Sequence, residues 1–281
     1  MSPGRVAALT LLAMLAFAGN SLLCRMALTR TGIDAASFTS IRIFSGALVL
    51  CLIVRRRTGS GQSAGNWLSA FALFAYAAAF SLSYASLSAA TGALLLFGAV
   101  QATMIGHGLW AGERLGGRQL IGLATASAGL VGLQLPGLSA PPLHGSLLML
   151  VAGVAWDAYS LRGKGAGDPL RVTAGNFLRA AVVAAGLSMV VLPGVSLDPA
   201  GVAYAIASGA LASGVGYAVW YTALRELHVT RAATVQLSVP VIAAVGGIVF
   251  LDEPLTYRLL LTSAAILGGV ALVIFGRRRT R

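Results

Sequence analysis

Gly112-Glu113-Arg114-Leu115 is a short polar segment between two hydrophobic runs, and a similar segment, Leu251-Asp252-Glu253-Pro254-Leu255, follows 140 positions later. At this offset the two copies continue to match on their carboxyl-terminal side. The matched pairs are Glu113 with Glu253, Leu115 with Leu255, Arg118 with Arg258, Leu120 with Leu260 and Gly129 with Gly269. A repeat of this length indicates two structural units of one kind within the chain.

The repeat extends toward the amino terminus at an offset of 137 positions. There it pairs Arg25 with Arg162, Arg42 with Arg179, Tyr84 with Tyr221 and Leu87 with Leu224. The offset changes across a polar stretch at 225–230, where three extra residues explain the difference. The sequence therefore predicts two halves that are built alike, residues 1–137 and residues 138–281.

Apolar residues make up 57% of the chain and charged residues only 10%, with a mean hydropathy of +0.84. Soluble domains carry about 25% charged residues, and a bilayer is crossed by about 20 consecutive apolar residues. Runs of this kind lie at 6–24, 36–54, 67–86, 89–111, 119–135, 145–162, 172–192, 200–223, 231–250 and 258–276. We expect an all-α integral membrane protein with ten transmembrane helices, five in each half.

The distribution of basic residues predicts the orientation of these helices. With the amino terminus in the cytoplasm, fifteen of the 20 lysines and arginines fall in cytoplasmic loops and termini, and three fall outside. Such a bias is typical of membrane proteins. Both termini are therefore expected in the cytoplasm, and the net charge of +12 reflects orientation rather than nucleic-acid binding.

The first hydrophobic run follows Arg5 and contains Ala16-Phe17-Ala18, a pattern that resembles a cleaved secretory signal. Cleavage would remove most of one helix from only one of two matching halves, in which Asn20 pairs with Asp157. We therefore expect the first helix to be retained.

Two arginines are predicted to lie within the membrane at equivalent positions of the two halves. Arg42 lies roughly 10 Å from the outer end of the second run, at 1.5 Å per residue, and Arg179 lies at similar depth from the inner end of the seventh. An intramembrane charge indicates a functional site by default, although long basic side chains also extend toward the nearer surface. Because both halves carry one, a structural or gating role is predicted for Arg42 and Arg179.

Aromatic side chains of the eighth run are candidates for the lining of a cavity. Tyr217, Trp220 and Tyr221 recur at positions i, i+3 and i+4 and so share one helix face, beside Gly214 and Gly216. Aromatic residues that face lipid or the membrane interface would produce the same pattern. Both interpretations remain open.

Asp157 and His107 are the candidates for proton coupling. Asp157 is one of the few carboxylates within the predicted helices, and His107 lies near the inner end of the fourth run. Asp157 is also five residues from Arg162 and could serve as a partner for a nearby cation. A histidine near the interface is commonly a hydrogen-bonded polar residue, so these roles also remain open.

Gln236-Leu237-Ser238-Val239-Pro240 is the polar part of the ninth run. A proline within a helix removes a backbone hydrogen bond and bends the helix, and the freed carbonyl groups can face the interior of a bundle. The matching residue of the fourth run is Val100, so the two halves differ here. We expect a structural or gating role for Pro240.

Five helices per half is an odd number, so the second half enters the membrane in the opposite direction to the first. Inverted repeats of this kind are typical of secondary transporters, which bind substrate near the membrane midplane, where the repeats meet. The repeat therefore predicts transport by alternating access.

With these features the chain resembles the drug/metabolite transporter superfamily and, within it, the EamA family. The resemblance covers essentially the whole chain and rests on the acidic segments at Glu113 and Glu253, on Arg42 and Arg179, and on Pro240. It implies a multi-pass exporter of amino acids or related metabolites in the bacterial inner membrane. Glu113 and Glu253 are expected to support the fold or the gates.

A narrower resemblance concerns the segment from Gly92 to Met104, which is similar to that of YddG-type exporters of aromatic and other neutral amino acids. Val100 departs from the family's usual proline in the first half. We expect export of neutral, aromatic amino acids or related metabolites through a central cavity. Its predicted lining is Asn20, Tyr84, Gln101, Trp156, Tyr217, Trp220, Tyr221, Gln236 and Ser238.

The expected partners are the small-molecule substrate, the lipid bilayer and protons, with no cofactor, metal or nucleic acid. An exporter of cationic drugs is the first alternative, and Asp157 would then contact the cation. A channel is disfavoured because channels usually form selectivity rings through oligomeric symmetry. An intramembrane enzyme is disfavoured because the sequence has no H-E-x-x-H motif.

Overall fold

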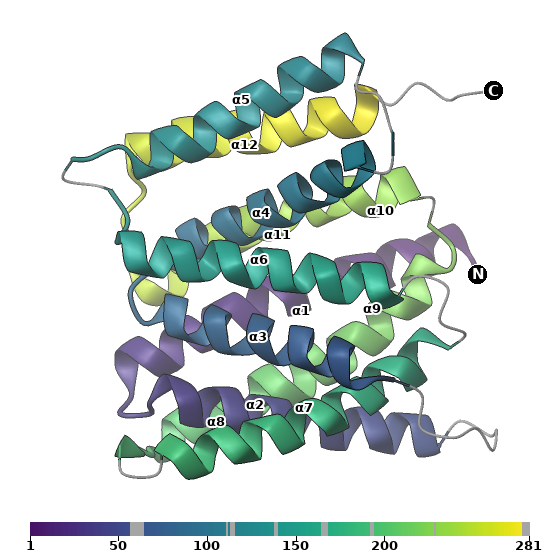
Figure 1. The fold of residues 1–281 in the computed structure, drawn as a ribbon, viewed down its shortest axis with the longest axis vertical. Helices are drawn as coiled ribbons and strands as arrows, with labels where there is room; N and C mark the ends of the chain where they lie inside the picture. Colours follow the sequence, from purple (N-terminus) through teal and green to yellow (C-terminus); the bar gives the residue numbers. More distant parts are fainter. Residues whose placement is uncertain are drawn as a thin grey trace.

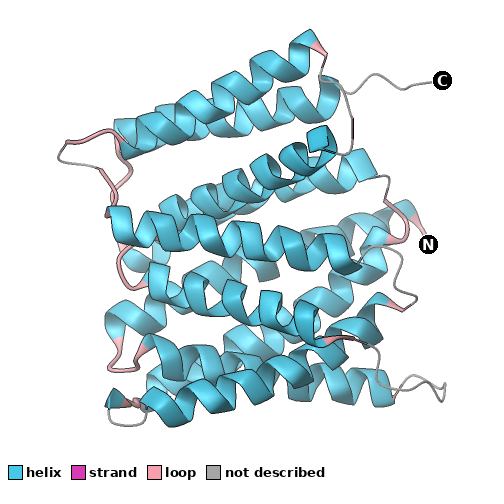
Figure 2. Cartoon of the chain, viewed as in Figure 1, coloured by secondary structure: helices cyan, strands magenta, loops and turns pink. Residues whose placement is uncertain are grey.

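A computed structural model of the chain describes residues 1–56, 65–110, 112, 116–137, 140–163, 168–191, 194–227 and 229–276. These residues form helices and short connections, with no β-strand among them (Figure 2). Eight of the helical spans are long and apolar enough to cross a membrane. The predicted all-α membrane fold is confirmed at this level.

The helices of the two halves follow one another along the chain. Up to residue 137 they are α1 (Pro3–Arg30), α2 (Ala35–Arg55), α3 (Trp67–Tyr84), α4 (Ala89–Trp110) and α5 (Gly117–Gln134). After residue 140 they are α6 (Leu143–Gly163), α7 (Pro169–Val191), α8 (Pro199–Ala207), the π-helix η2 (Ser208–Val215), α9 (Gly216–Leu224), α10 (Val229–Gln236), α11 (Ser238–Leu251) and α12 (Tyr257–Gly276).

The helices lie side by side in one bundle, and α1 begins at the same end of it at which α12 ends (Figure 1). We call this end the termini end and the other the opposite end. Large apolar side chains face outward along the bundle, among them Leu48, Val131, Val182 and Leu261, which are 62%, 63%, 62% and 72% exposed. Apolar surface of this extent is unfavourable in water and is suited to lipid.

Carboxylate and amide side chains fix where several helices begin. Asp34 accepts hydrogen bonds from the backbone N–H groups of Ala36 and Ser37 at the start of α2. Asn66 accepts one from the N–H of Ser69 in α3. Such caps satisfy donors that the first turn of a helix leaves free.

Two spans of the second half depart from regular α-helix. Residues Pro199–Leu224 continue without a break, but their middle part, η2, is a π-helix. The span after it is interrupted at Leu237, between α10 and α11, three residues before Pro240. The interruption agrees with the predicted effect of the proline, because Pro240 has no N–H to donate to the carbonyl of Gln236.

Helices that are far apart in the sequence pack against one another in the bundle. α5 packs on α12, α2 on α7, α4 on α11 and α3 on α6. Glycines permit some of these approaches: a Cβ atom on Gly269 would lie 2.6 Å from the backbone nitrogen of Ala126, and one on Gly129 would lie 2.8 Å from Cγ1 of Ile266. Small residues allow helix backbones to come this close.

Candidate functional site

A small central cavity of about 40 Å³ lies in the middle of the bundle. Its lining combines aromatic rings with a few polar groups: Phe17, Asn20, Ser21, Tyr76, Phe80, Leu96, Phe97, Val100, Trp156, Ala212, Ser213, Tyr217 and Gln236. The aromatic rings contact one another, with ring centroids 4.9 Å apart for Tyr76 and Trp156 and 5.5 Å apart for Trp156 and Tyr217. Apolar walls with few polar groups are typical of small-molecule sites.

A second cavity of about 330 Å³, the larger cavity, adjoins the central cavity and shares Val100, Trp156, Tyr217 and Gln236 with it. It extends toward the termini end, since its wall includes Ser160, Leu161 and Gly163 at the end of α6, Pro169 at the start of α7 and Leu224 at the end of α9. Its volume lies within the range of about 300–1,000 Å³ that is usual for ligand pockets.

Most of the predicted lining residues meet at these two cavities. Asn20 lines the central cavity, where its Oδ1 accepts a hydrogen bond of 2.6 Å from Ser208. Trp156, Tyr217 and Gln236 line both cavities, and the larger cavity adds Gln101, Asp157, Trp220 and Tyr221. Asp157 is 1% exposed and interacts with neighbouring residues.

Other predicted residues lie elsewhere among the described residues. Tyr84 is fully buried near the opposite end, and Ser238 donates to the carbonyl of Val235 at the break before α11. His107 is exposed near the end of α4 and lines neither cavity. Pro240 is buried in α11. Glu113 lies outside the described residues.

The structure adds residues that the sequence analysis did not single out. Thr173 and Asn176 of α7 line the larger cavity. The Tyr159 hydroxyl donates to that of Thr173 at 3.3 Å, and the Thr173 hydroxyl donates to the carbonyl of Pro169 at 2.8 Å and lies 3.4 Å from the hydroxyl of Tyr221. The spacing of Thr173 and Asn176 indicates that they act together, since these polar residues at i and i+3 share a helix face.

The two intramembrane arginines differ in their surroundings. Arg179 is partly buried and donates from Nη1 to the carbonyl of Gly175, one turn earlier in its own helix, at 2.9 Å. Arg42 is only 2% exposed. It donates from Nη2 to the Tyr76 hydroxyl at 3.2 Å and from Nε to the Ser213 hydroxyl at 3.5 Å.

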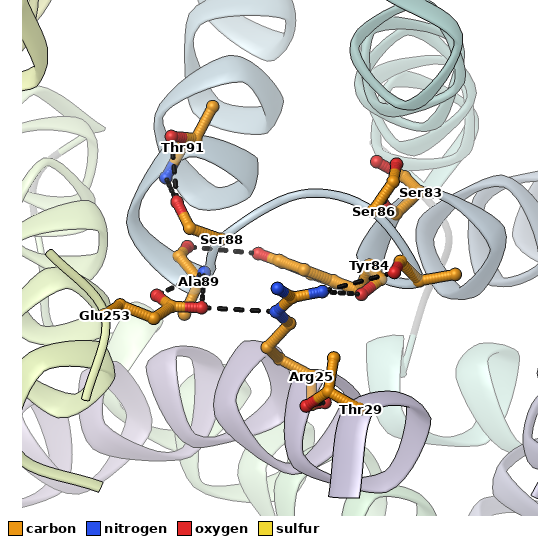
Figure 3. A network of polar contacts seen from close by, with 10 residues as sticks. Arg25, Thr29, Ser83, Tyr84, Ser86, Ser88, Ala89, Thr91 and Glu253 are labelled. Atoms are coloured by element: carbon orange, nitrogen blue, oxygen red, sulfur yellow. Dashed lines mark hydrogen bonds and ion pairs between the residues drawn. The ribbon is translucent and has the colours of Figure 1, made fainter. Parts of the chain in front are cut away.

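At the opposite end a polar network joins α1, α3, α4 and the segment after α11 (Figure 3). Arg25 pairs with Glu253 at 3.2 Å and donates to the carbonyl of Tyr84 at 2.9 Å and to that of Ala85 at 3.3 Å. Both oxygens of Glu253 accept from the N–H of Ala89, at 2.8 and 3.1 Å. A carboxylate at this position is favoured because Ala89 begins α4, where the helix dipole is positive. We call these contacts the Arg25–Glu253 network.

The backbone around Glu253 explains how its side chain reaches α4. Asp252 adopts a left-handed conformation, with φ of 56°, and so ends α11. Glu253 then folds back over Gly247, where a Cβ atom would lie 2.5 Å from its carboxylate. The central cavity is lined by residues that precede Arg25 in α1 and Tyr84 in α3, and the larger cavity extends from it toward the termini end. The network therefore lies between the two cavities and the opposite end.

Residues 143–275 match the EamA-like transporter family. An uncharacterised protein of Pseudomonas aeruginosa is 57% identical over 278 residues, which cover 99% of this chain and 97% of that protein. The chain belongs to the EamA-like transporter family. Its resemblance to that family, predicted from the repeated acidic segments, is thereby confirmed, and the chain is a transporter with a multi-pass membrane fold.

More distant relatives of this EamA-family transporter carry functional names. A probable amino-acid metabolite efflux pump of Escherichia coli K12 is 28% identical over 182 residues, which cover 59% of this chain and 61% of that protein. An uncharacterised transporter of Archaeoglobus fulgidus is 25% identical over 165 residues, covering 58% of this chain and 59% of that protein. A crystal structure of a protein with 19% identity covers 99% of this chain and 100% of its own, at a TM-score of 0.68. That likeness shows a shared fold.

Proposed function

We propose that this EamA-family transporter exports neutral, aromatic amino acids or related metabolites across the bacterial inner membrane by alternating access. The observation that carries the proposal is the aromatic and amide lining shared by the two adjoining cavities, in particular Trp156, Tyr217 and Gln236. Aromatic rings favour aromatic side chains through stacking and edge-to-face contact. The sequence resemblance to YddG-type exporters implies cargo of this kind, and the name of the Escherichia coli relative supports amino-acid cargo.

The proposed architecture has ten membrane crossings, as two inverted repeats of five helices over residues 1–137 and 138–281. Reciprocal contacts between α5 and α12 support it. Gly129 approaches Ile266, and Gly269 approaches Ala126. The repeat, with its offset of 140 positions, pairs Gly129 with Gly269 and Ala126 with Ile266. A two-fold axis therefore converts one of these contacts into the other. Contacts between α2 and α7 and between α4 and α11 also join equivalent helices.

The proposed orientation places both termini in the cytoplasm, in agreement with the bias of basic residues. The larger cavity then extends toward the cytoplasm, and the Arg25–Glu253 network closes the outer end. This arrangement corresponds to a state that takes up substrate from the cytoplasm, as an exporter requires. Release would need the network to open while the wall around Tyr159 and Tyr221 closes.

Counterflow in proteoliposomes tests the proposal. Vesicles loaded with unlabelled phenylalanine should accumulate external labelled phenylalanine, saturably and faster than empty vesicles do. The same measurement with threonine as cargo and label tests the aromatic preference. If neither amino acid exchanges in vesicles that contain folded protein, the amino-acid assignment is wrong. Linear, non-saturable uptake would instead indicate a channel.

Export of cationic compounds is a second candidate, because Asp157 lines the larger cavity. A carboxylate in an aromatic wall could contact an ammonium group, which the ring faces also attract. Counterflow of a quaternary ammonium compound, compared between the wild type and Asp157→Asn, separates the two candidates. Loss of cation exchange with retained phenylalanine exchange would show two kinds of cargo, and cation exchange alone would replace the amino-acid proposal.

A further inference from the structure

Arg42 is buried in the middle of the bundle. No Asp or Glu among the described residues lies within 4 Å of its guanidinium group. The ionisable groups near it include Tyr76, Tyr217 and Cys24, which carry no negative charge near neutral pH at their ordinary pKa values. An isolated buried charge is strongly unfavourable, so its retention calls for a counter-charge.

The guanidinium group lies directly behind the wall of the central cavity. The side chains that contact it are Tyr76, Ser213 and Phe80, and all three line that cavity. Its central carbon lies 4.8 Å from the centroid of the Phe80 ring and 5.4 Å from that of Tyr76. Its Nη1 atom is buried and has no hydrogen-bond partner in the part of the chain that the structure describes.

The central cavity has room for a small anionic group. Its volume is about 40 Å³, and roughly 10–15 Å³ of such space is sufficient for one water molecule. None of its lining residues carries a negative charge. A carboxylate placed there would approach the guanidinium past Tyr76 and Ser213, and the rest of an aromatic amino acid would extend into the adjoining larger cavity.

We propose that Arg42 recognises the carboxylate of the substrate, with the carboxylate in the central cavity and the aromatic side chain in the larger cavity. This inference rests on the proposed function and extends it to substrate chemistry: the cargo is a carboxylate-bearing compound. Arginine is suited to the role because its planar group donates two parallel hydrogen bonds to a carboxylate. The π-helix η2 contributes Ser213 to the same site, and π-helical segments are frequent at functional sites.

Four compounds of similar shape test the inference by counterflow, each serving as internal cargo and as external label. Phenylalanine has both charged groups, phenylpropionate has only the carboxylate, and phenylalaninamide and phenethylamine have only the amine. We expect the two carboxylates to reach half-saturation at concentrations about tenfold or more below those of the two amines, the range of a charge-assisted hydrogen bond. Equal half-saturation for the four compounds would overturn the inference.

Variants of Arg42 then test whether this residue is responsible for the preference for carboxylates. Arg42→Gln is expected to raise the half-saturation of the carboxylates about tenfold or more and to leave that of any exchanged amine unchanged. Arg42→Lys should restore part of the preference. Arg179→Gln is the matched control, because Arg179 occupies the equivalent position of the repeat and already bonds its own helix. A folded Arg42→Gln protein that keeps the wild-type preference would contradict the role of Arg42.

The ligand series also separates this inference from the proposed function, and it does not depend on the variants folding. Exchange of phenylpropionate without phenylalanine would reject the amino-acid cargo and support carboxylate recognition. Exchange of the amines alone would reject carboxylate recognition and favour the cationic candidate. Exchange of none of the four compounds would reject both proposals for aromatic cargo.

Discussion

At the scale of single residues, the Arg25–Glu253 network is expected to hold the opposite end of the bundle closed. Glu253→Gln removes the charge that pairs with Arg25, whose side chain is 20% exposed. The expected cost to the closed state is about 1.5–3 kcal/mol, so the open state becomes about tenfold or more populated. Cys24 is fully buried beside Arg25 and reports opening. In a Cys51→Ser background, a membrane-impermeant maleimide should label Cys24 faster in the variant.

Arg30→Gln is the matched control for Glu253→Gln. Arg30 also pairs across the same end, with Asp252 at 3.2 Å, but the two side chains are 45% and 89% exposed. Exposed ion pairs contribute little to stability. Labelling of Cys24 should therefore stay at the wild-type rate in Arg30→Gln. Equal acceleration in both variants would show that the Arg25–Glu253 pair has no special role.

The sequence shows which side chains are polar, charged or aromatic, but it does not show which other side chains surround each of them in the fold. A polar side chain such as that of Gln236 is costly to place toward lipid and therefore indicates the bundle interior, whereas an aromatic residue such as Trp156 can also face lipid or the interface. Tyr84 shares a face of α3 with the cavity residues Tyr76 and Phe80, yet it lies against the Arg25–Glu253 network, because it is the last residue of the helix. The surroundings of Arg42 depend on Tyr76 and Ser213, which lie 34 and 171 positions away in the sequence.

At the scale of helices, the contact between α5 and α12 should tolerate no side chain at Gly269. A Cβ atom there would lie 2.5 Å from the carbonyl oxygen of Gly122 and 2.6 Å from the nitrogen of Ala126, both backbone atoms. Gly269→Ala is expected to cost about 1–3 kcal/mol through overpacking, measured as a lower midpoint of thermal unfolding in detergent. Gly268→Ala is the control: a Cβ there meets nothing within 4 Å, and alanine improves helix propensity. Equal midpoints for the two variants would contradict the packing.

The start of α2 should lose stability in acid. Partial burial raises the pKa of Asp34, but hydrogen bonds from Ser37, Ser196 and Ala36 outweigh it and hold the pKa below its ordinary value. The carboxylate therefore stabilises the fold fully above the pKa of an unfolded aspartate, about 3.9, and the contribution disappears as the pH falls through the lower folded value. Asp34→Ala should cost about 1 kcal/mol near neutral pH.

Asp34→Asn separates the charge of this cap from its shape. Asparagine caps a helix about as well as aspartate but does not titrate. We expect near-wild-type stability at neutral pH and a weaker fall below pH 4, monitored as the unfolding midpoint in detergent across a pH series. An unchanged acid profile in Asp34→Asn would show that other carboxylates dominate the acid response.

At this scale the hydrophobic runs predicted where helices lie, because a run of about 20 apolar residues has the length and composition of a helix that crosses the bilayer. Two features of the helices could not be predicted from the sequence. Nothing in Ser208–Val215 distinguishes a π-helix from an α-helix by composition. The pairing of α3 with α6 depends on complementary surfaces in three dimensions. The interruption before α11 was predictable because proline has a local and unavoidable effect on helix hydrogen bonds.

At the scale of the whole molecule, the bundle can be oriented by two positions that must lie on different sides of a membrane. α1 contains 28 residues and is about 42 Å long, more than the hydrocarbon thickness of about 30 Å. Ser2 precedes it at the termini end. Ser196 lies at the opposite end, where its hydroxyl donates to the carbonyl of Gly32, just after α1.

Single cysteines at these positions decide whether the termini are cytoplasmic. In a Cys24→Ser/Cys51→Ser background, an impermeant maleimide applied to intact cells should label Ser196→Cys and should label Ser2→Cys only after the membrane is permeabilised. The reverse pattern would overturn the proposed orientation, and the larger cavity would then extend toward the outside. The Arg25–Glu253 network would then lie on the cytoplasmic side. Because an exporter must take its cargo from the cytoplasm, the closed network would in that case be the gate through which cargo enters.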